Sequence, residues 1–122
     1  MEKKIFLIDD EVSLIRVIKA CLEKEGYKVF CFSSGEKALS ELKDIMPDLI
    51  VLDIKMQGIN GYEVCEIIKS NEYYSGIPIL VITGLDTADA RSTSFIAGAD
   101  DYLAKPFGIK DILSKVEYLI AK

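Results

Sequence analysis

Five side chains that could bind a phosphate or a metal each follow an apolar run of strand length. They are three carboxylates, one hydroxyl and one ammonium: Asp9, Asp10, Asp53, Thr83 and Lys105. Clustered carboxylates repel one another, so either their pKa values rise or a cation lies among them. Oxygen ligands without nitrogen or sulfur suit Mg²⁺. Beside a lysine, a hydroxyl and a metal, one carboxylate can attack phosphorus and form an aspartyl phosphate.

The run Leu49–Leu52 places Asp53 at the centre of the predicted fold. Four consecutive apolar residues without polar alternation are typical of a strand that helices cover on both faces of a parallel sheet. Open α/β sheets bind ligands at the carboxyl ends of their strands, which is where Asp53 falls. A buried carboxylate without a partner is costly, so other residues should approach Asp53.

The rest of the chain predicts five strand–helix units in one domain that covers residues 1–122. Strands are expected at Lys4–Ile8, Lys28–Phe32, Leu49–Leu52, Ile77–Ile82 and Asp101–Ala104, and a helix follows each. This alternation with short loops predicts a parallel sheet with helices on both faces and right-handed crossovers. The carboxyl ends of parallel strands share one edge, so the five polar side chains can meet in one pocket.

Local signals predict where the helices begin and end. Three helix starts have capping patterns, which are Ser33 with Glu36, Asn60 with Glu63, and Asp86 or Thr87. Three helix ends have residues that stop a helix, which are Gly26, Pro47 and Gly98. The third helix is expected to turn Val64, Ile67 and Ile68 inward. The fourth has a thin apolar stripe, mostly alanines plus Phe95 and Ile96.

Composition excludes several classes of protein. The net charge of −5 and the pI near 4.8 argue against direct binding of nucleic acid. No apolar run approaches the roughly 20 residues of a membrane span, and the N-terminus lacks a signal-peptide core. Three cysteines without metal-like spacing predict buried free thiols in a reducing cytosol, so we expect a cytoplasmic protein. The chain has no histidine, which excludes a histidine triad, an imidazole ligand and an internal phosphohistidine.

Each of these residues also has a purely structural interpretation. The first acidic pair can cap the helix that follows it, and Asp53 can cap a loop. Thr83 can be a turn hydroxyl, Lys105 a solvated surface lysine and Tyr102 a half-buried core residue. Independent accidents at four strand ends are much less probable than one shared site, which favours the functional interpretation.

The motifs around these residues together resemble the receiver domain of two-component response regulators. The resemblance covers essentially the whole chain and rests on these segments, in order: Asp9-Asp10, LDIKM around Asp53, VITG around Thr83, and AGADDYLAKPF through Tyr102 and Lys105. It implies a flavodoxin-like, doubly wound sheet with strand order 2-1-3-4-5. It also implies a regulatory phosphoacceptor that catalyses only its own phosphorylation and dephosphorylation.

Metal and acceptor roles follow from the resemblance. Asp53 would accept the phosphoryl group from a histidine kinase or phosphotransfer protein. Asp10, with Asp9, would hold Mg²⁺ together with Asp53. Lys55 would add its backbone carbonyl as a further metal ligand.

The resemblance also implies a switch. Thr83 would bond one phosphoryl oxygen and move toward it, Lys105 would pair with another, and Tyr102 would then turn inward. The Lys105–Pro106 bond would be cis. The surface formed by the fourth helix, fifth strand and fifth helix would change and contact a downstream output domain or protein. A phosphorylation-dependent homodimer of this chain is a further possible result.

The chain departs from the family pattern only at residues other than the expected acceptor Asp53, its metal ligands, Thr83 and Lys105. Gln57, Asn60 and Gly84 replace the residues that are frequent at these positions, which affects loop rigidity. Lys55 and Leu85 flank the expected phosphoryl site, and we hypothesise that they set the lifetime of the aspartyl phosphate.

Rival classes remain open. A phosphohydrolase with an aspartate nucleophile usually carries a second aspartate two residues later, where this chain has Lys55. An interaction module that has lost phosphorylation tends to lose the acidic pair, the acceptor or the lysine, all of which are present. A flavin-binding protein would need a phosphate-cradling loop where this chain has Asp9, Asp10 and Glu11, which would repel phosphate.

Overall fold

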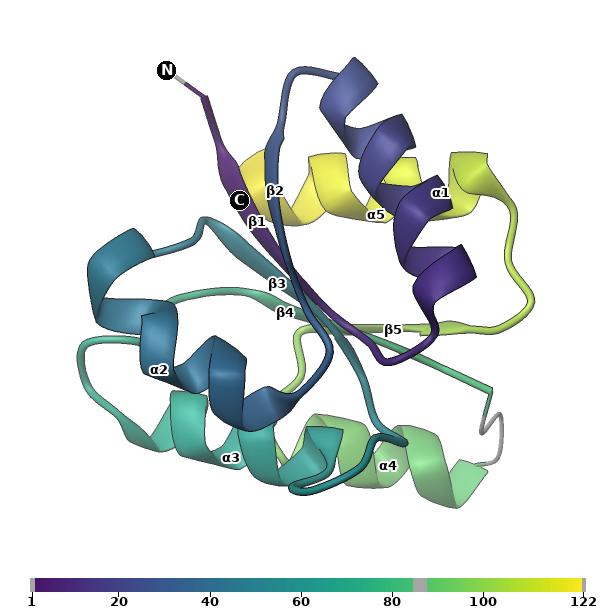
Figure 1. Ribbon diagram of the computed structural model, residues 1–122. Helices are drawn as coiled ribbons and strands as arrows, with labels where there is room; N and C mark the ends of the chain where they lie inside the picture. The colour runs from purple at the N-terminus through teal and green to yellow at the C-terminus, as the bar shows by residue number, and fades with distance from the viewer. Residues whose placement is uncertain (1, 85–87, 122) are drawn as a thin grey trace.

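A computed structural model describes residues 2–84 and 88–121 and shows a five-stranded parallel sheet with the order β2-β1-β3-β4-β5 (Figure 1). The strands are β1 (Lys4–Ile8), β2 (Lys28–Phe32), β3 (Leu49–Asp53), β4 (Ile79–Thr83) and β5 (Asp101–Ala104). The helices are α1 (Val12–Lys24), α2 (Gly35–Ile45), α3 (Gly61–Ser70), α4 (Ala88–Ile96) and α5 (Ile109–Ala121). The predicted fold class and strand order are confirmed.

The strand register brings the predicted site residues to one edge of the sheet. Ile8 at the end of β1 pairs with Leu52 in β3, one residue before Asp53. Asp53 in turn pairs with Ile82 in β4, one residue before Thr83. Thr83 pairs with Ala104, the last residue of β5. The polar residues that follow these strands therefore lie at neighbouring strand ends.

Helices cover both faces of the sheet. Helices α1 and α5 lie on one face, and α2, α3 and α4 lie on the other (Figure 1). Alternate strand residues point to opposite faces, so Phe6 and Ile8 join the core under α2 and α3, whereas Ile5 and Leu7 join the core under α1 and α5. Every residue of β3 is buried, as its unbroken apolar pattern predicts.

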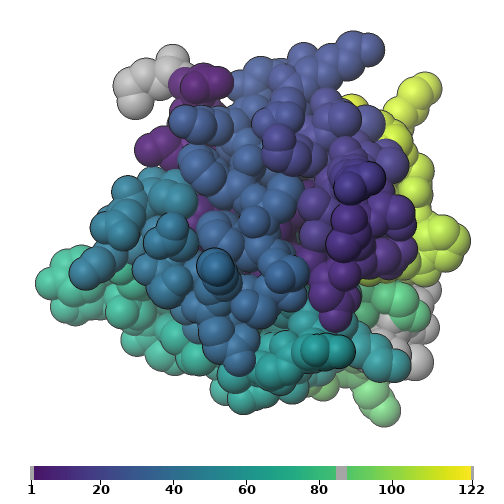
Figure 2. Space-filling view, viewed as in Figure 1, coloured from purple at the N-terminus to yellow at the C-terminus, as the bar shows by residue number. Residues whose placement is uncertain are grey.

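The surface is formed by these helical layers. In the space-filling view of Figure 2, the N-terminal third of the chain, with α1, β2 and α2, forms the central part of the surface facing the viewer.

Among the described residues, none of the helices combines the length and hydropathy needed to cross a membrane. Cys65 is buried but Cys21 and Cys31 are only partly buried, so the prediction of buried thiols holds fully for Cys65 alone.

The helix ends confirm most capping predictions and contradict one. Asn60 and Glu63 form the predicted capping box of α3. For α2 the N-cap is Ser34, whose side chain accepts from the Lys37 amide, so the predicted box of Ser33 with Glu36 is wrong. The Glu36 carboxylate is engaged instead by the backbone of the loop before α3.

Two glycines end helices as the sequence predicts. Gly26 and Gly98 have φ angles of +96° and +112° at the ends of α1 and α4, a left-handed region that suits glycine. The expected cap of α4, Asp86 or Thr87, lies outside the described residues, as does Leu85.

Three apolar side chains do not pack as predicted. Ile67 is 50% exposed, because Val64, Cys65 and Ile68 form the buried side of α3. On α4, Phe95 and Ile96 are 50% and 86% exposed, and the buried side chains are the small Ala90 and Ser94. A helix that buries only small side chains gains little from hydrophobic burial, so α4 is held less tightly than its neighbours.

Strand β4 begins later than predicted. Ile77 lies in the turn before it, where its amide donates to the carbonyl of Tyr74. The strand therefore starts at Ile79 and reaches Thr83.

Candidate functional site

Asp53 is the last residue of β3 and is 5% exposed. Its strand lies between β1 and β4, so its carboxylate emerges between two other strand ends. Burial of a carboxylate at this position requires compensating partners.

Two further carboxylates approach Asp53. Oxygen atoms of Asp9, Asp10 and Asp53 all lie within 4.8 Å of one another. Asp9 is 1% exposed, whereas Asp10 is exposed. The amide of Glu11, the N-cap residue of α1, donates to Asp9 Oδ1 at 3.0 Å. Asp9 therefore orients the start of α1, as its structural interpretation predicts, and also belongs to the acidic cluster.

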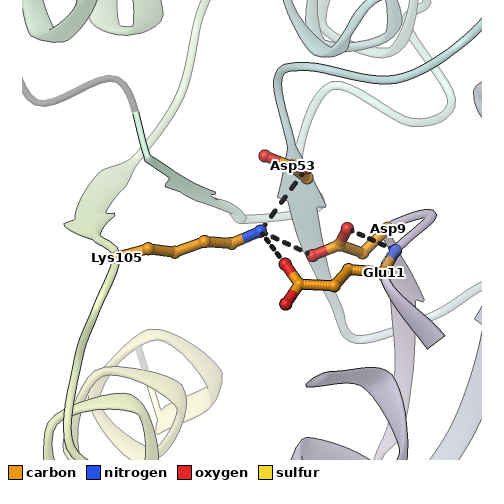
Figure 3. Close-up of polar contacts among 4 residues, drawn as sticks. All are labelled: Asp9, Glu11, Asp53 and Lys105. Atoms are coloured by element: carbon orange, nitrogen blue, oxygen red, sulfur yellow. Dashed lines mark hydrogen bonds and ion pairs between the residues drawn. The ribbon is translucent and has the colours of Figure 1, made fainter. Parts of the chain in front are cut away.

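Lys105 points toward the carboxylates of Asp9, Glu11 and Asp53 (Figure 3). Its Nζ is 3.1 Å from Asp9 Oδ2 and 3.5 Å from Asp53 Oδ2. A third contact, 3.4 Å long, joins Nζ to Glu11 Oε1. The Lys105 amide donates to the Thr83 carbonyl at 2.8 Å, and the Lys105–Pro106 bond is cis, as the resemblance implies. The surface interpretation of Lys105 is therefore wrong.

Glu11 is a site residue that the sequence analysis did not assign. Its only sequence signal is its position directly after the acidic pair. Its side chain is 55% exposed, so its contact with Lys105 is the most solvated of the three.

The site disfavours an additional buried negative charge. Burial, followed by the charge of Asp9, raises the pKa of Asp53 from 3.8 to about 6, although Lys105 opposes this shift. Burial acts to lower the pKa of Lys105, but its hydrogen bond with Asp9 and the charges of Asp53, Asp9 and Glu11 raise it on balance. Three carboxylates thus contact one ammonium, with Asp10 beside two of them, and a cation would relieve the imbalance of charge.

Five of the predicted site residues line one open cavity of about 380 Å³, and Asp9 is not among them. It is lined by Asp10, Glu11, Asp53, Lys55, Thr83, Gly84 and Lys105. Thr83 is fully buried at the end of β4, and Lys55 is exposed. The cavity combines a buried carboxylate, a hydroxyl and an ammonium, which is a set of groups that can surround a phosphoryl group.

Tyr102 lies outside this cavity. It is 8% exposed on β5 and lines a neighbouring depression with Arg91 and Phe95 of α4. The Arg91 guanidinium carbon lies 5.3 Å from the centre of its ring. Its ring is thus already inward in this structure, next to α4.

Gly61 is a second residue whose role the sequence analysis missed. A Cβ on Gly61 would lie 2.4 Å from the Asp53 carbonyl oxygen and 2.6 Å from Ile54 Cα. The Gly61 amide donates to the Ile54 carbonyl at 2.8 Å. Only glycine can bring the start of α3 this close to the backbone that carries Asp53. Its signal in the sequence is a turn-type glycine directly after the Asn60 cap.

The donor set fits a hard divalent cation. The three clustered side chains offer oxygen atoms only, one of them from an exposed carboxylate that faces solvent. Mg²⁺ prefers such ligands and retains several waters, which an open cavity allows.

Comparison with known protein families gives an independent result. The family model of the response regulator receiver domain matches residues 5–117. The alkaline phosphatase synthesis transcriptional regulatory protein PhoP of Bacillus subtilis is 35% identical over 122 residues, 100% of this chain. The DNA-binding response regulator MtrA of Mycolicibacterium paratuberculosis is 34% identical over 117 residues, 95% of this chain. The chain spans about half the length of these relatives, 50% of each.

Solved structures agree with the fold. A putative response regulator from Chloroflexus aurantiacus has a TM-score of 0.95 and 30% identity, with full coverage of both chains. The BeF3-activated DrrB receiver domain has a TM-score of 0.90 and 28% identity, also with full coverage of both chains.

Proposed function

Because this chain belongs to the response regulator receiver domain family of two-component signalling, we propose that it is a phosphoacceptor switch in which Asp53 takes the phosphoryl group. The observation that carries this proposal is the position of the Asp53 carboxylate. It opens into a cavity with Thr83 and lies 3.5 Å from Lys105 and beside two other aspartates.

Asp53 is the nucleophile in the proposed transfer. A carboxylate oxygen of Asp53 attacks the phosphorus of a phosphohistidine on a histidine kinase or phosphotransfer protein. The P–N bond breaks, the donor imidazole keeps the electron pair, and an acyl phosphate forms on Asp53. The absence of histidine from this chain is consistent with a donor on another protein.

Asp9, Asp10, the Asp53 carboxylate and the Lys55 carbonyl would hold Mg²⁺. The ion supplies charge neutralisation for the phosphoryl oxygens and for the acidic cluster. Lys105 and the Thr83 hydroxyl would bind the remaining phosphoryl oxygens. The attacking form of Asp53 is the ionised one, and both the ammonium of Lys105 and a bound cation favour it.

The signal would leave the site through Thr83 and Tyr102. Phosphorylation draws Thr83 toward the phosphoryl group and shifts the population of Tyr102 and α4 positions. The loose packing of α4, which buries only Ala90 and Ser94 along its length, supports this part of the proposal. The face of α4, β5 and α5 then contacts an output domain or protein, or a second copy of the chain as a phosphorylation-dependent homodimer. The protein is proposed to act in the cytoplasm.

Intact-protein mass tests the acceptor chemistry. The purified chain is incubated with acetyl phosphate and Mg²⁺, next to Asp53→Asn and a sample containing EDTA. We expect a gain of one phosphoryl group in the wild type with Mg²⁺ and none in the other two samples. A wild type that binds Mg²⁺ but gains no mass is retested with a phosphorylated histidine kinase. No gain in either assay contradicts the proposal and favours an interaction module without phosphorylation.

A further inference from the structure

The loop between β3 and α3, residues 54–60, carries the Lys55 carbonyl, and its side chains Met56 and Ile59 are partly buried against the core. At its base, the Gly61 amide donates to the Ile54 carbonyl at 2.8 Å. Most of its remaining residues are exposed or half-buried. A metal ligand on such a loop needs the loop backbone to be held in place, because ordering it on binding would weaken the metal affinity.

The first turn of α2 supplies an attachment at the tip of this loop. Glu36 Oε2 accepts a hydrogen bond from the Ile59 amide at 3.3 Å, across 23 residues of sequence. Gly58 has a φ of +80°, and a Cβ added to it would lie 2.6 Å from the same Glu36 oxygen. A Cβ added to Gly35 would lie 3.1 Å from Ile59 Cγ1. The Glu36 carboxylate therefore lies directly against the loop backbone at two consecutive residues.

We propose that Glu36 is a positioning residue for the metal site, which it serves by fixing the loop that presents the Lys55 carbonyl. This inference rests on the proposed function, since it assumes that Mg²⁺ binds at the acidic cluster. Glu36 does not belong to the cluster formed by Asp9, Asp10 and Asp53, and it would act through the Ile59 amide. Because Ser34 is the N-cap of α2, Glu36 is not at the N3 position of a capping box, and its carboxylate is available to the loop.

A purely local role for Glu36 predicts a different result. Glu36 lies in the first turn of α2, where a negative charge stabilises a helix through the helix dipole. That role needs the charge of Glu36. The loop attachment needs a hydrogen-bond acceptor, which glutamine also provides through its amide oxygen. Glu36→Ala removes both properties and Glu36→Gln removes only the charge, so the two variants separate the two roles.

The experiment follows the ¹H–¹⁵N NMR signals of the wild type, Glu36→Ala and Glu36→Gln. Amide hydrogen exchange of Ile59 is measured in EDTA, and the Kd for Mg²⁺ is then measured by titration. In Glu36→Ala, the loss of one partly solvated hydrogen bond should speed exchange of Ile59 and raise the Kd for Mg²⁺, each by about two- to tenfold. Glu36→Gln should stay within about twofold of the wild type in both quantities.

Glu66→Ala is the matched control, because Glu66 is an exposed glutamate on α3 and its removal changes the net charge equally. It should alter neither quantity. Unchanged Mg²⁺ affinity in Glu36→Ala overturns the proposal, and so does a Glu36→Gln variant as impaired as Glu36→Ala, which would assign the effect to charge. A wild type that binds no Mg²⁺ is a distinct result: it contradicts the metal site of the proposed function, while Ile59 exchange still reports whether Glu36 holds the loop.

Discussion

Asp53 is a carboxylate that the folded chain holds in an unfavourable environment. It is 5% exposed and lies beside two other aspartates, with Lys105 as the nearest cation. Burial and the charge of Asp9 raise its pKa to about 6. The repulsion between these carboxylates would favour cation binding, because a bound cation removes this repulsion in addition to making new contacts.

Asp53→Asn should stabilise the metal-free protein, and more so at higher pH. The folded-state pKa of about 6 exceeds the ordinary value of 3.8, so the folded chain holds this proton more tightly than the unfolded chain. The stability contributed by this group is fully present below pH 3.8 and is lost as the pH rises through 6. At pH 7.5 the variant should gain about 1–3 kcal/mol in free energy of unfolding.

Urea unfolding in EDTA checks this prediction at pH 7.5 and pH 4.5. The advantage of the variant should shrink at the lower pH, where Asp53 of the folded wild type is protonated. A wild type that is as stable as Asp53→Asn at pH 7.5 would contradict the assigned environment.

At the scale of elements, the site depends on how closely α3 approaches the end of β3. The Gly61 amide bonds to the Ile54 carbonyl, and the Cα of Gly61 is packed against the Asp53 carbonyl. Asn60 and Glu63 cap the helix at the same point, so the start of α3 and the end of β3 are fixed to each other. A displacement of α3 would therefore move the backbone that carries Asp53.

Gly61→Ala should lower both stability and phosphorylation. Its Cβ would lie 2.4 Å from a backbone oxygen that cannot rotate away, so the helix or the strand end must shift. We expect a loss of about 1–3 kcal/mol in free energy of unfolding, as for other overpacked sites. Phosphorylation by acetyl phosphate should also slow.

Gly76→Ala is the matched control for this prediction. A Cβ on Gly76 has no heavy atom within 4 Å, so the substitution should leave phosphorylation unchanged. Chemical denaturation and intact mass give both quantities for the two variants. Equal behaviour of the two alanine variants would show that the close approach of Gly61 is not required.

At the scale of the whole molecule, the three-layered fold gathers the acidic cluster from distant parts of the chain. Asp9 and Asp10 lie in the connection that follows β1, Asp53 is the last residue of β3, and Lys105 directly follows β5. A cation that binds only the folded arrangement stabilises the whole domain in proportion to its occupancy. The two aspartates after β1 should contribute to this in different ways, because Asp9 is buried and Asp10 is exposed.

Mg²⁺ should raise the Tm of the wild type, and Asp10→Asn should abolish most of this shift. Because Asp10 is exposed, the variant should retain the Tm of the metal-free wild type or exceed it slightly, since one repulsive charge is removed. Asp9→Asn should lower the Tm even without metal, because Asp9 accepts from the Glu11 amide and from Lys105. Thermal unfolding in EDTA and in Mg²⁺ separates these effects. A Mg²⁺ shift that persists in Asp10→Asn would place the ion elsewhere.

The amino-acid sequence by itself determined the order of elements and most residues of the site, but not Glu11 or Gly61. Continuous apolar runs, capping residues and positive-φ glycines are local properties, and they placed β1, β2, the Asn60 cap and the ends of α1 and α4 correctly. The gathering of Asp9, Asp53 and Lys105 could also be predicted, because parallel strands bring their carboxyl ends to one edge.

Only the tertiary structure decided which partner each side chain takes. Glu36 contacts Ile59 across 23 residues in place of a local capping box. Glu11 bonds to Lys105, which lies 94 residues away in the chain. Ile96 is apolar but points to solvent, since α4 meets the sheet through small side chains. Periodicity and local propensity describe one element at a time, whereas these contacts depend on the distance and orientation between elements, which exist only once the layers have packed.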